Sequence, residues 1–281
     1  MRCISPIYIR KTGQSVPCGK CNFCLQTKRA DWSFRLNQEL KQCDSAHFLT
    51  FTYDDETIPT DPLSGLPTLS KSDVQLFVKR LRKVNKEFSA YPLRYYTVGE
   101  YGSETSRPHY HSIMFNLAEH VAERLENLWA VPRGKTELVH AGHVHVGAVE
   151  IASIQYVTKY VINRAGEYTG REPPFSFMSK RPGLGASYLD THRAWHRKDL
   201  RNYTNVNGQT SRLPRYYKEK LFSKLEKAKL ALEAVGLSDQ KYYDEVVRLA
   251  RYHPHPMRYL DEIVQQKHDN LFKTLNEKNT Y

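Results

Sequence analysis

Two histidines separated by a single residue, His109 and His111, begin an apolar run that continues through Phe115. Alternate residues of a β-strand share one face of its sheet, so both imidazoles are expected to point the same way. Glu100 ends an earlier strand-like segment, and the residues between it and Pro108 are typical of a hairpin loop. The pattern therefore predicts a hairpin that brings Glu100 beside His109. Two imidazoles and one carboxylate leave open positions on a divalent ion, which suits Mg²⁺ or Mn²⁺ engaging a phosphate.

The apolar pattern along the rest of the chain predicts an α+β fold. Strands rich in aromatic and β-branched residues are expected at 48–54, 93–99, 109–117 and 143–149. Helices are expected at 25–40, 72–86, 119–129 and 151–161, and from 215 onward with breaks at Gly236 and at 253–256. Ser72 is expected to cap the second of these helices, with Gln75 as its capping-box partner. Loops containing Gly and Pro are expected at 55–67 and to dominate from 166 to 214.

Tyr156 and Tyr160 are one helical turn apart. Residues four apart share a helix face, so both phenols are expected to reach the same point, with Lys159 beside them. A phenol is a weak nucleophile unless a cation helps it to ionise. Next to a divalent ion that polarises a phosphate, paired phenols suit cleavage of a phosphodiester by transesterification, in which one phenol releases the strand held by the other. Because the chain has 19 Tyr, packing or base stacking remains the alternative for such a pair.

A second pair with the same spacing, His143 and His145, provides an internal comparison. Paired histidines often do no more than line a strand face. This second pair lacks a carboxylate at hairpin distance upstream, although His140 could join it as a third imidazole. The spacing alone therefore favours His109 and His111 only modestly.

Four of the five cysteines fall within the first 24 residues, namely Cys3, Cys18, Cys21 and Cys24. Successive C-x-x-C spacings let thiolates converge on one tetrahedral ion, so a structural Zn²⁺ is expected, with Cys3 as the fourth ligand. An iron–sulfur cluster uses similar spacing, and plain thiols are the remaining alternative. Cys43 is expected to be a free thiol, since a disulfide framework does not suit a cytosolic chain.

The composition favours a nucleic-acid partner. The net charge is +12, and the chain contains 19 Tyr, 11 Phe and 3 Trp, so phosphates and bases could both be contacted. A ribosome-associated or membrane-surface protein would also be basic. However, no apolar run approaches the roughly 18–20 residues that span a bilayer, and the N-terminus lacks the apolar core of a signal peptide. We therefore expect no membrane partner and a cytosolic location.

A phosphate-binding loop for a nucleotide-driven motor is not expected. Gly134-Lys135-Thr136 resembles the end of such a loop, but Trp129 occupies the place of its first glycine. Any strand separation would therefore depend on a partner.

Together these motifs resemble the replication initiators of microviruses, particularly the gokushovirus branch of single-stranded DNA phages. The resemblance runs through most of residues 1–217. It rests on the order and spacing of segments 16–21, 31–32, 48–54, 98–102, 107–111, 156–160, 179–185 and 214–217.

The resemblance implies an HUH endonuclease, with a central antiparallel sheet flanked by helices, that nicks one origin strand during rolling-circle replication and later rejoins it. It implies metal ligands at Glu100, His109 and His111, nucleophiles at Tyr156 and Tyr160, and an ordinary strand at His143 and His145. Related initiators often carry Lys three residues after the second tyrosine, where this chain has Asn163 beside Arg164. The order in which the tyrosines act therefore stays open.

Four segments are expected as domains: a cysteine knuckle and basic helix at 1–44, the HUH core at 45–165, a loop-rich DNA-binding extension at 166–217, and a helical C-terminal region at 218–281. The expected partners are single-stranded DNA, the phage origin, and a host helicase and DNA polymerase, in the cytoplasm of a bacterial host. Two alternatives remain. One is a non-catalytic, zinc-dependent nucleic-acid-binding protein, and the other is a plasmid initiator or transposase of the same superfamily.

Overall fold

The structure is a computed structural model that describes residues 3–11, 13–134, 136–160, 168, 170–206 and 208–277. The chain divides into two compact units. One comprises Trp32–Ser187, and the other joins Met1–Asp31 to Tyr188–Tyr281. These units are drawn differently from the four expected segments, whose boundaries stay a prediction.

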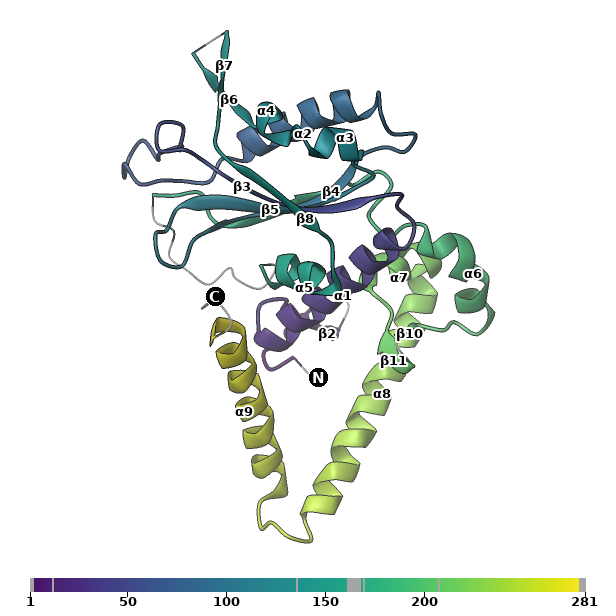
Figure 1. Cartoon of the computed structure of the whole chain (residues 1–281). Helices are drawn as coiled ribbons and strands as arrows, with labels where there is room; N and C mark the ends of the chain where they lie inside the picture. The colour runs from purple at the N-terminus through teal and green to yellow at the C-terminus, as the bar shows by residue number, and fades with distance from the viewer. Residues whose placement is uncertain are drawn as a thin grey trace. The chain divides into compact units, whose positions relative to one another are not determined.

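A five-stranded antiparallel sheet forms the centre of the Trp32–Ser187 unit (Figure 1). Its strands, in spatial order, are β8 (Val144–Ala148), β3 (Ala46–Thr52), β5 (Pro108–Phe115), β4 (Arg94–Tyr101) and β9 (Phe175–Met178). The strands expected at 48–54, 93–99, 109–117 and 143–149 are confirmed, and so is the hairpin that joins β4 to β5. The α+β class with a central antiparallel sheet is therefore confirmed.

Helices cover both faces of this sheet (Figure 1). One face carries α2 (Lys71–Asn85) with two short helices, α3 (Glu119–Ala122) and α4 (Leu125–Leu128). The other face carries α5 (Ile151–Lys159) and the C-terminal part of α1 (Asn22–Leu40). A small hairpin, β6 (Ala130–Arg133) with β7 (Glu137–His140), follows α4.

The alternation of side chains along β5 separates two hydrophobic cores. Tyr110 and Met114 point into the core beneath α2, whereas Ile113 and Phe115 point into the core beneath α5. Because His109 and His111 have the same parity as Ile113, they lie on the α5 face. The same residues that build the second core therefore fix the face on which the histidines appear.

Two details around the first core differ from the sequence-based expectations. Ser70, rather than Ser72, caps α2, and its hydroxyl accepts a hydrogen bond from the backbone N–H of Asp73. Ser72 lies inside the helix, since the chain turns two residues earlier than expected. The helix expected at 119–129 is instead the pair α3 and α4, interrupted between Ala122 and Leu125.

The second unit contains the N-terminal and C-terminal elements. Its strands pair as two hairpins, β1 (Ile7–Ile9) with β2 (Gln14–Val16) and β10 (Tyr203–Val206) with β11 (Gln209–Arg212). Its helices are α6 (Tyr188–Lys198), α7 (Arg215–Leu221), α8 (Lys224–Leu249) and α9 (Pro256–Glu277), and it also holds the first part of α1.

Two expectations for this part of the chain are wrong. Loops do not dominate 166–214, because β9, α6, β10 and β11 all lie within it. Gly236 does not end a helix, because α8 runs through it without a break, although the break at 253–256 is confirmed. Within the described residues, none of the helices combines the length and apolar composition that crossing a bilayer requires.

Candidate metal centres and tyrosine pair

The predicted ligands Glu100, His109 and His111 come together on the α5 face of the sheet. Glu100 on β4 is the direct register partner of His109 on β5, as the hairpin between them requires. Glu100 and His111 are buried, and His109 is half-buried. One side-chain donor atom from each residue lies within 4.8 Å of the others.

The donor atoms have the spacing of a divalent metal site. Glu100 Oε1 lies 3.0 Å from His109 Nε2 and 3.0 Å from His111 Nε2. An octahedral ion with bonds of about 2.1 Å separates adjacent ligands by roughly 3.0 Å. The residues present therefore fit a small divalent cation such as Mg²⁺ or Mn²⁺.

Polar contacts behind the two histidines orient their rings. His111 Nδ1 lies 3.0 Å from Thr50 Oγ1 on β3, and His109 Nδ1 lies 3.2 Å from the carbonyl oxygen of Arg107. An N–H on each Nδ1 that donates to these oxygens leaves the Nε2 lone pair for an ion. Thr50 is thus a supporting residue that the sequence motifs did not single out.

The charges of the three groups are coupled through burial and hydrogen bonding. Burial opposes ionisation of Glu100, but hydrogen bonds from His109 and His111 outweigh it and lower the pKa of Glu100 to about 2. Burial lowers the pKa of His111, with further contributions from His109 and Lys159. A carboxylate that stays ionised beside a neutral imidazole is the protonation state that a metal ion requires.

Helix α5 brings both tyrosines to this centre, as the four-residue spacing predicted. The Tyr156 hydroxyl lies 3.3 Å from His111 Nε2, and the rings of Tyr156 and Tyr160 lie 5.2 Å apart, edge to face. The Tyr160 ring stacks on the His111 ring at 6.0 Å. Buried Ile154 and Val157 anchor the opposite face of the helix in the second core, which turns the tyrosines toward the histidines.

The tyrosines differ in accessibility, and Lys159 contacts both. Tyr156 is 37% exposed, whereas Tyr160 packs against the second core. Burial raises the pKa of both phenols, and the negative charge of Glu100 raises both pKa values further. Lys159 Nζ lies 5.1 Å from the centre of the Tyr156 ring and 5.4 Å from that of Tyr160. Asn163 and Arg164, which bear on the order of the tyrosines, lie outside the described residues.

The comparison pair lacks this arrangement. His145 faces the α5 side in the same row as Thr50 and His111, at the exposed edge strand β8. His143 precedes the strand, and its imidazole lies 3.8 Å from Asp54 and 3.7 Å from Glu126. Among the described residues, neither histidine belongs to a three-ligand group of His, Cys, Asp or Glu.

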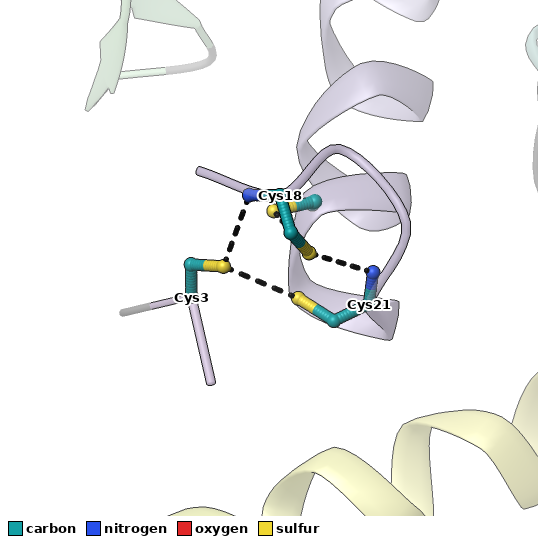
Figure 2. Close-up of side chains that lie close together, drawn as sticks. Cys3, Cys18 and Cys21 are labelled. Carbon is teal, nitrogen blue, oxygen red and sulfur yellow. Dashed lines mark hydrogen bonds between the residues drawn. The ribbon is translucent and has the colours of Figure 1, made fainter. Parts of the chain in front are cut away.

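The four N-terminal cysteines converge as a second candidate metal centre, and Figure 2 shows three of them, Cys3, Cys18 and Cys21, around one point. Cys3 Sγ lies 3.8 Å from Cys21 Sγ, and Cys18 Sγ lies 4.0 Å from Cys24 Sγ. A tetrahedral ion with bonds of about 2.3 Å to sulfur separates its ligands by about 3.8 Å. The thiols therefore fit a structural metal ion, and Cys43 is a separate free thiol as expected.

Backbone hydrogen bonds prepare Cys18 for an anionic role. The backbone N–H groups of Cys21 and Lys20 donate to its sulfur, at 3.2 and 3.4 Å, and lower the pKa of Cys18 to about 6. Burial raises the pKa of Cys24 to about 12 when no metal ion is considered. Donation from successive backbone amides to a sulfur is typical of metal knuckles, where it stabilises thiolate charge.

The C-terminal helix α9 contacts the chain directly beside this cysteine cluster. The backbone N–H of Asn22 donates to His268 Nε2 at 3.1 Å, and Asn22 Nδ2 donates to the carbonyl oxygen of His268 at 3.2 Å. The His268 ring also meets Phe23 edge to face at 5.3 Å. Sequence motifs did not indicate this contact, which joins residues 246 positions apart.

Comparisons with known proteins agree with the motif-based resemblance. A family model for replication-associated proteins of the ORF2 type matches residues 46–165, which hold the Glu100 centre and both tyrosines. Replication-associated protein VP4 of Bdellovibrio phage phiMH2K is 30% identical over 218 residues, which cover 72% of this chain and 66% of that protein. Replication-associated protein ORF2 of Spiroplasma virus 4 is 25% identical over 217 residues, which cover 74% of this chain and 68% of that protein.

Replication-associated protein ORF4 of Chlamydia phage 1 is 25% identical over 288 aligned residues, which cover 90% of this chain and 70% of that protein. The chain thus spans about two thirds of the length of the curated relatives that it matches. No solved structure matches the chain. The family model and the phage relatives nevertheless agree with each other and with the motifs: the chain belongs to the microvirus-type family of replication-associated proteins.

Proposed function

We propose that this protein initiates rolling-circle replication as an HUH endonuclease that nicks and later rejoins one strand at the phage origin. The observation that carries the proposal is the 3.3 Å separation between the Tyr156 hydroxyl and His111 Nε2, within a group of Glu100, His109 and His111 that fits a divalent ion. A nucleophile and a phosphate-polarising site are thus within one phosphate's width of each other.

The proposed reaction is a transesterification at phosphorus. The Tyr156 Oη attacks the scissile phosphate, the P–O3′ bond breaks, and O3′ takes up a proton to become a free 3′ hydroxyl. The phenolic proton passes to solvent, and the 5′ end stays attached as a phosphotyrosine. Mg²⁺ or Mn²⁺ held by Glu100, His109 and His111 would polarise the phosphate oxygens. No bond energy is lost, so the reverse reaction rejoins a strand without nucleotide hydrolysis.

The surroundings of the tyrosines suggest different roles for them. Tyr156 is more accessible and is the tyrosine whose hydroxyl contacts His111, so we propose that it makes the first cut. Tyr160, which packs between Tyr156 and the core, would then attack the held strand in the later exchange. The ammonium of Lys159 is near both rings and would stabilise either phenolate.

We propose Zn²⁺ for the cysteine centre, with a structural rather than catalytic role. It would fix the start of α1, which is also the point that His268 contacts. The net charge of +12 supports single-stranded DNA as the substrate. Host helicase and polymerase in a bacterial cytoplasm are the partners that a nicking protein needs to extend the 3′ end.

The test is a nicking assay with single-stranded oligonucleotides that tile the genome encoding the chain. With Mn²⁺, we expect an adduct that migrates as protein plus DNA, and its loss in Tyr156→Phe/Tyr160→Phe without loss of DNA binding. Tyr91→Phe changes a tyrosine that is 57% exposed outside the site, and should leave the adduct intact. Adduct formation by the double variant would refute the proposal.

The histidines allow a second, matched comparison. His109→Ala should abolish Mn²⁺-dependent cleavage, whereas His143→Ala, at an exposed histidine outside the three-residue group, should not. If the wild type binds DNA but never cleaves it with any divalent ion, the non-catalytic zinc-dependent binding protein becomes the better interpretation.

A further inference from the structure

The middle of α8 lacks tertiary contacts that would account for its stability. Every residue from 231 to 241 is exposed, which is three full turns of helix. A solvated helix without a packed face is only marginally stable in water. α8 and α9 diverge from the turn that joins them, so α9 does not cover this stretch (Figure 1). The helix therefore needs a surface outside the described residues of one chain.

One side of α8 carries an apolar stripe. At 100° per residue, five large apolar side chains fall within an arc of about 120°, which is the width of a helix interface. They are Leu225, Leu232, Val235, Tyr243 and Val247, with exposed fractions of 81%, 68%, 56%, 64% and 45%. A contiguous exposed row of this kind marks an interaction surface. Leu237, although 66% exposed, lies on the other side of the helix.

Gly236 lies within the same arc, near the middle of the stripe. A glycine inside a helix costs about 1 kcal/mol relative to alanine, so it needs a compensating reason. Within the described residues, no heavy atom lies within 4 Å of the position that a Cβ would take. The reason is therefore not a close contact inside this chain, and it fits the close approach of another helix.

The charges of α8 fit a second copy of the same helix. In a chain with a net charge of +12, α8 contains five Lys and Arg and five Asp and Glu, so it offers a polyanion little attraction. Lys224 and Lys229 flank the stripe in its first half, and Asp244 and Glu245 lie beside it in the second half. Two copies packed antiparallel about Gly236 would place Lys229 opposite Asp244, and Lys224 opposite Glu245, on the two sides of the contact.

We propose that α8 is a dimerisation helix that packs antiparallel against α8 of a second copy of this chain, with Gly236 near the two-fold axis. The stripe becomes the dry seam of the contact, and the lysines of each copy pair with the acids of the other. The contact does not depend on the nicking chemistry, so either proposal can fail without the other.

The test is the mass of the full-length protein in solution, measured by light scattering and sedimentation in the absence of DNA. We expect a dimer for the wild type and a monomer for Val235→Glu. The variant places an unpaired carboxylate twice in the seam, so its dissociation constant should rise roughly a hundredfold. Leu237→Glu introduces the same charge two residues away on the opposite side, and should remain dimeric.

Charge reversal tests the antiparallel register. Lys229→Glu should weaken the dimer several-fold, and adding Asp244→Lys should restore it, because the pair is then reversed in both copies. Circular dichroism distinguishes dissociation from a failure of the variants to fold.

A wild type that is monomeric at tens of micromolar would overturn the proposal. So would a monomer that binds vesicles of phosphatidylcholine and phosphatidylglycerol through the stripe, since the occupant would then be a lipid surface. A dimer that Val235→Glu leaves intact would equally exclude α8 as its interface.

Discussion

Replacing Thr50 by Val removes one hydrogen bond from behind the metal centre and leaves every ligand in place. The Thr50 hydroxyl lies 3.0 Å from His111 Nδ1 and holds the ring with Nε2 toward Glu100. Valine has nearly the same shape, so the β-strand and its packing should be unchanged. The variant therefore tests whether orientation of the His111 ring matters for the ion.

The expected loss follows from two independent ranges. One hydrogen bond contributes about 0.5–1.5 kcal/mol net, which corresponds to roughly 2- to 13-fold in affinity. Loss of a partner behind a metal ligand typically costs about 10- to 100-fold in metal affinity. The ranges meet near tenfold, so we expect Thr50→Val to weaken Mn²⁺ binding about tenfold.

Thr52→Val provides the matched control. Thr52 is two residues along the same strand and is the register partner of His109. Within the described residues, no hydrogen bond from its side chain to a histidine is present. Titration calorimetry with Mn²⁺ should give the wild-type affinity for Thr52→Val and the weaker affinity for Thr50→Val. Equal affinities for the two variants would refute the role assigned to Thr50.

Three further predictions concern stability. Cys21→Ser should release one equivalent of zinc and lower the melting temperature, whereas Cys43→Ser should retain the zinc; equal zinc content in both, measured by atomic absorption, would contradict the Cys₄ centre. Ile154→Ala, beneath the tyrosine helix, should lower the free energy of unfolding by about 2–5 kcal/mol in urea titration, and a loss below about 1 kcal/mol would argue against its burial. Burial lowers the pKa of His196 below its usual 6.5, so this residue's contribution to stability is complete above pH 6.5 and is lost as the pH falls through the folded-state pKa. Urea titrations from pH 7.5 to pH 5 should show that loss in the wild type and a smaller one in His196→Gln.

Local patterns predicted the parts of the fold that place the candidate site. The two-residue period of β5 and the hairpin that returns the chain from Glu100 to His109 determine which side chains share a face. The four-residue period of α5 does the same for Tyr156 and Tyr160. These are near-neighbour relations, so a single sequence contains enough information to predict them.

Relations between distant segments were missed because no local period encodes them. β9 joins the sheet beside β4, and Thr50 supports His111 from the neighbouring strand. Ser72 was expected as the helix cap because it precedes the apolar period, yet Ser70 is held in place by the Tyr110 hydroxyl, which accepts from its backbone N–H at 2.8 Å. Gly236 was expected to end a helix from its propensity alone, which neighbouring helix formers override.

Mass spectrometry of the trapped protein–oligonucleotide adduct tests the central claim most directly. Full-length protein would react with Mn²⁺ and the cleaved single-stranded oligonucleotide, and tryptic peptides would then be sequenced. The account predicts a 5′-phosphate linked to the peptide that carries Tyr156, with Tyr160 modified once Tyr156 is replaced by Phe. A covalent link at any residue away from the Glu100, His109 and His111 centre, or metal-dependent cleavage with no protein-linked product, would contradict it.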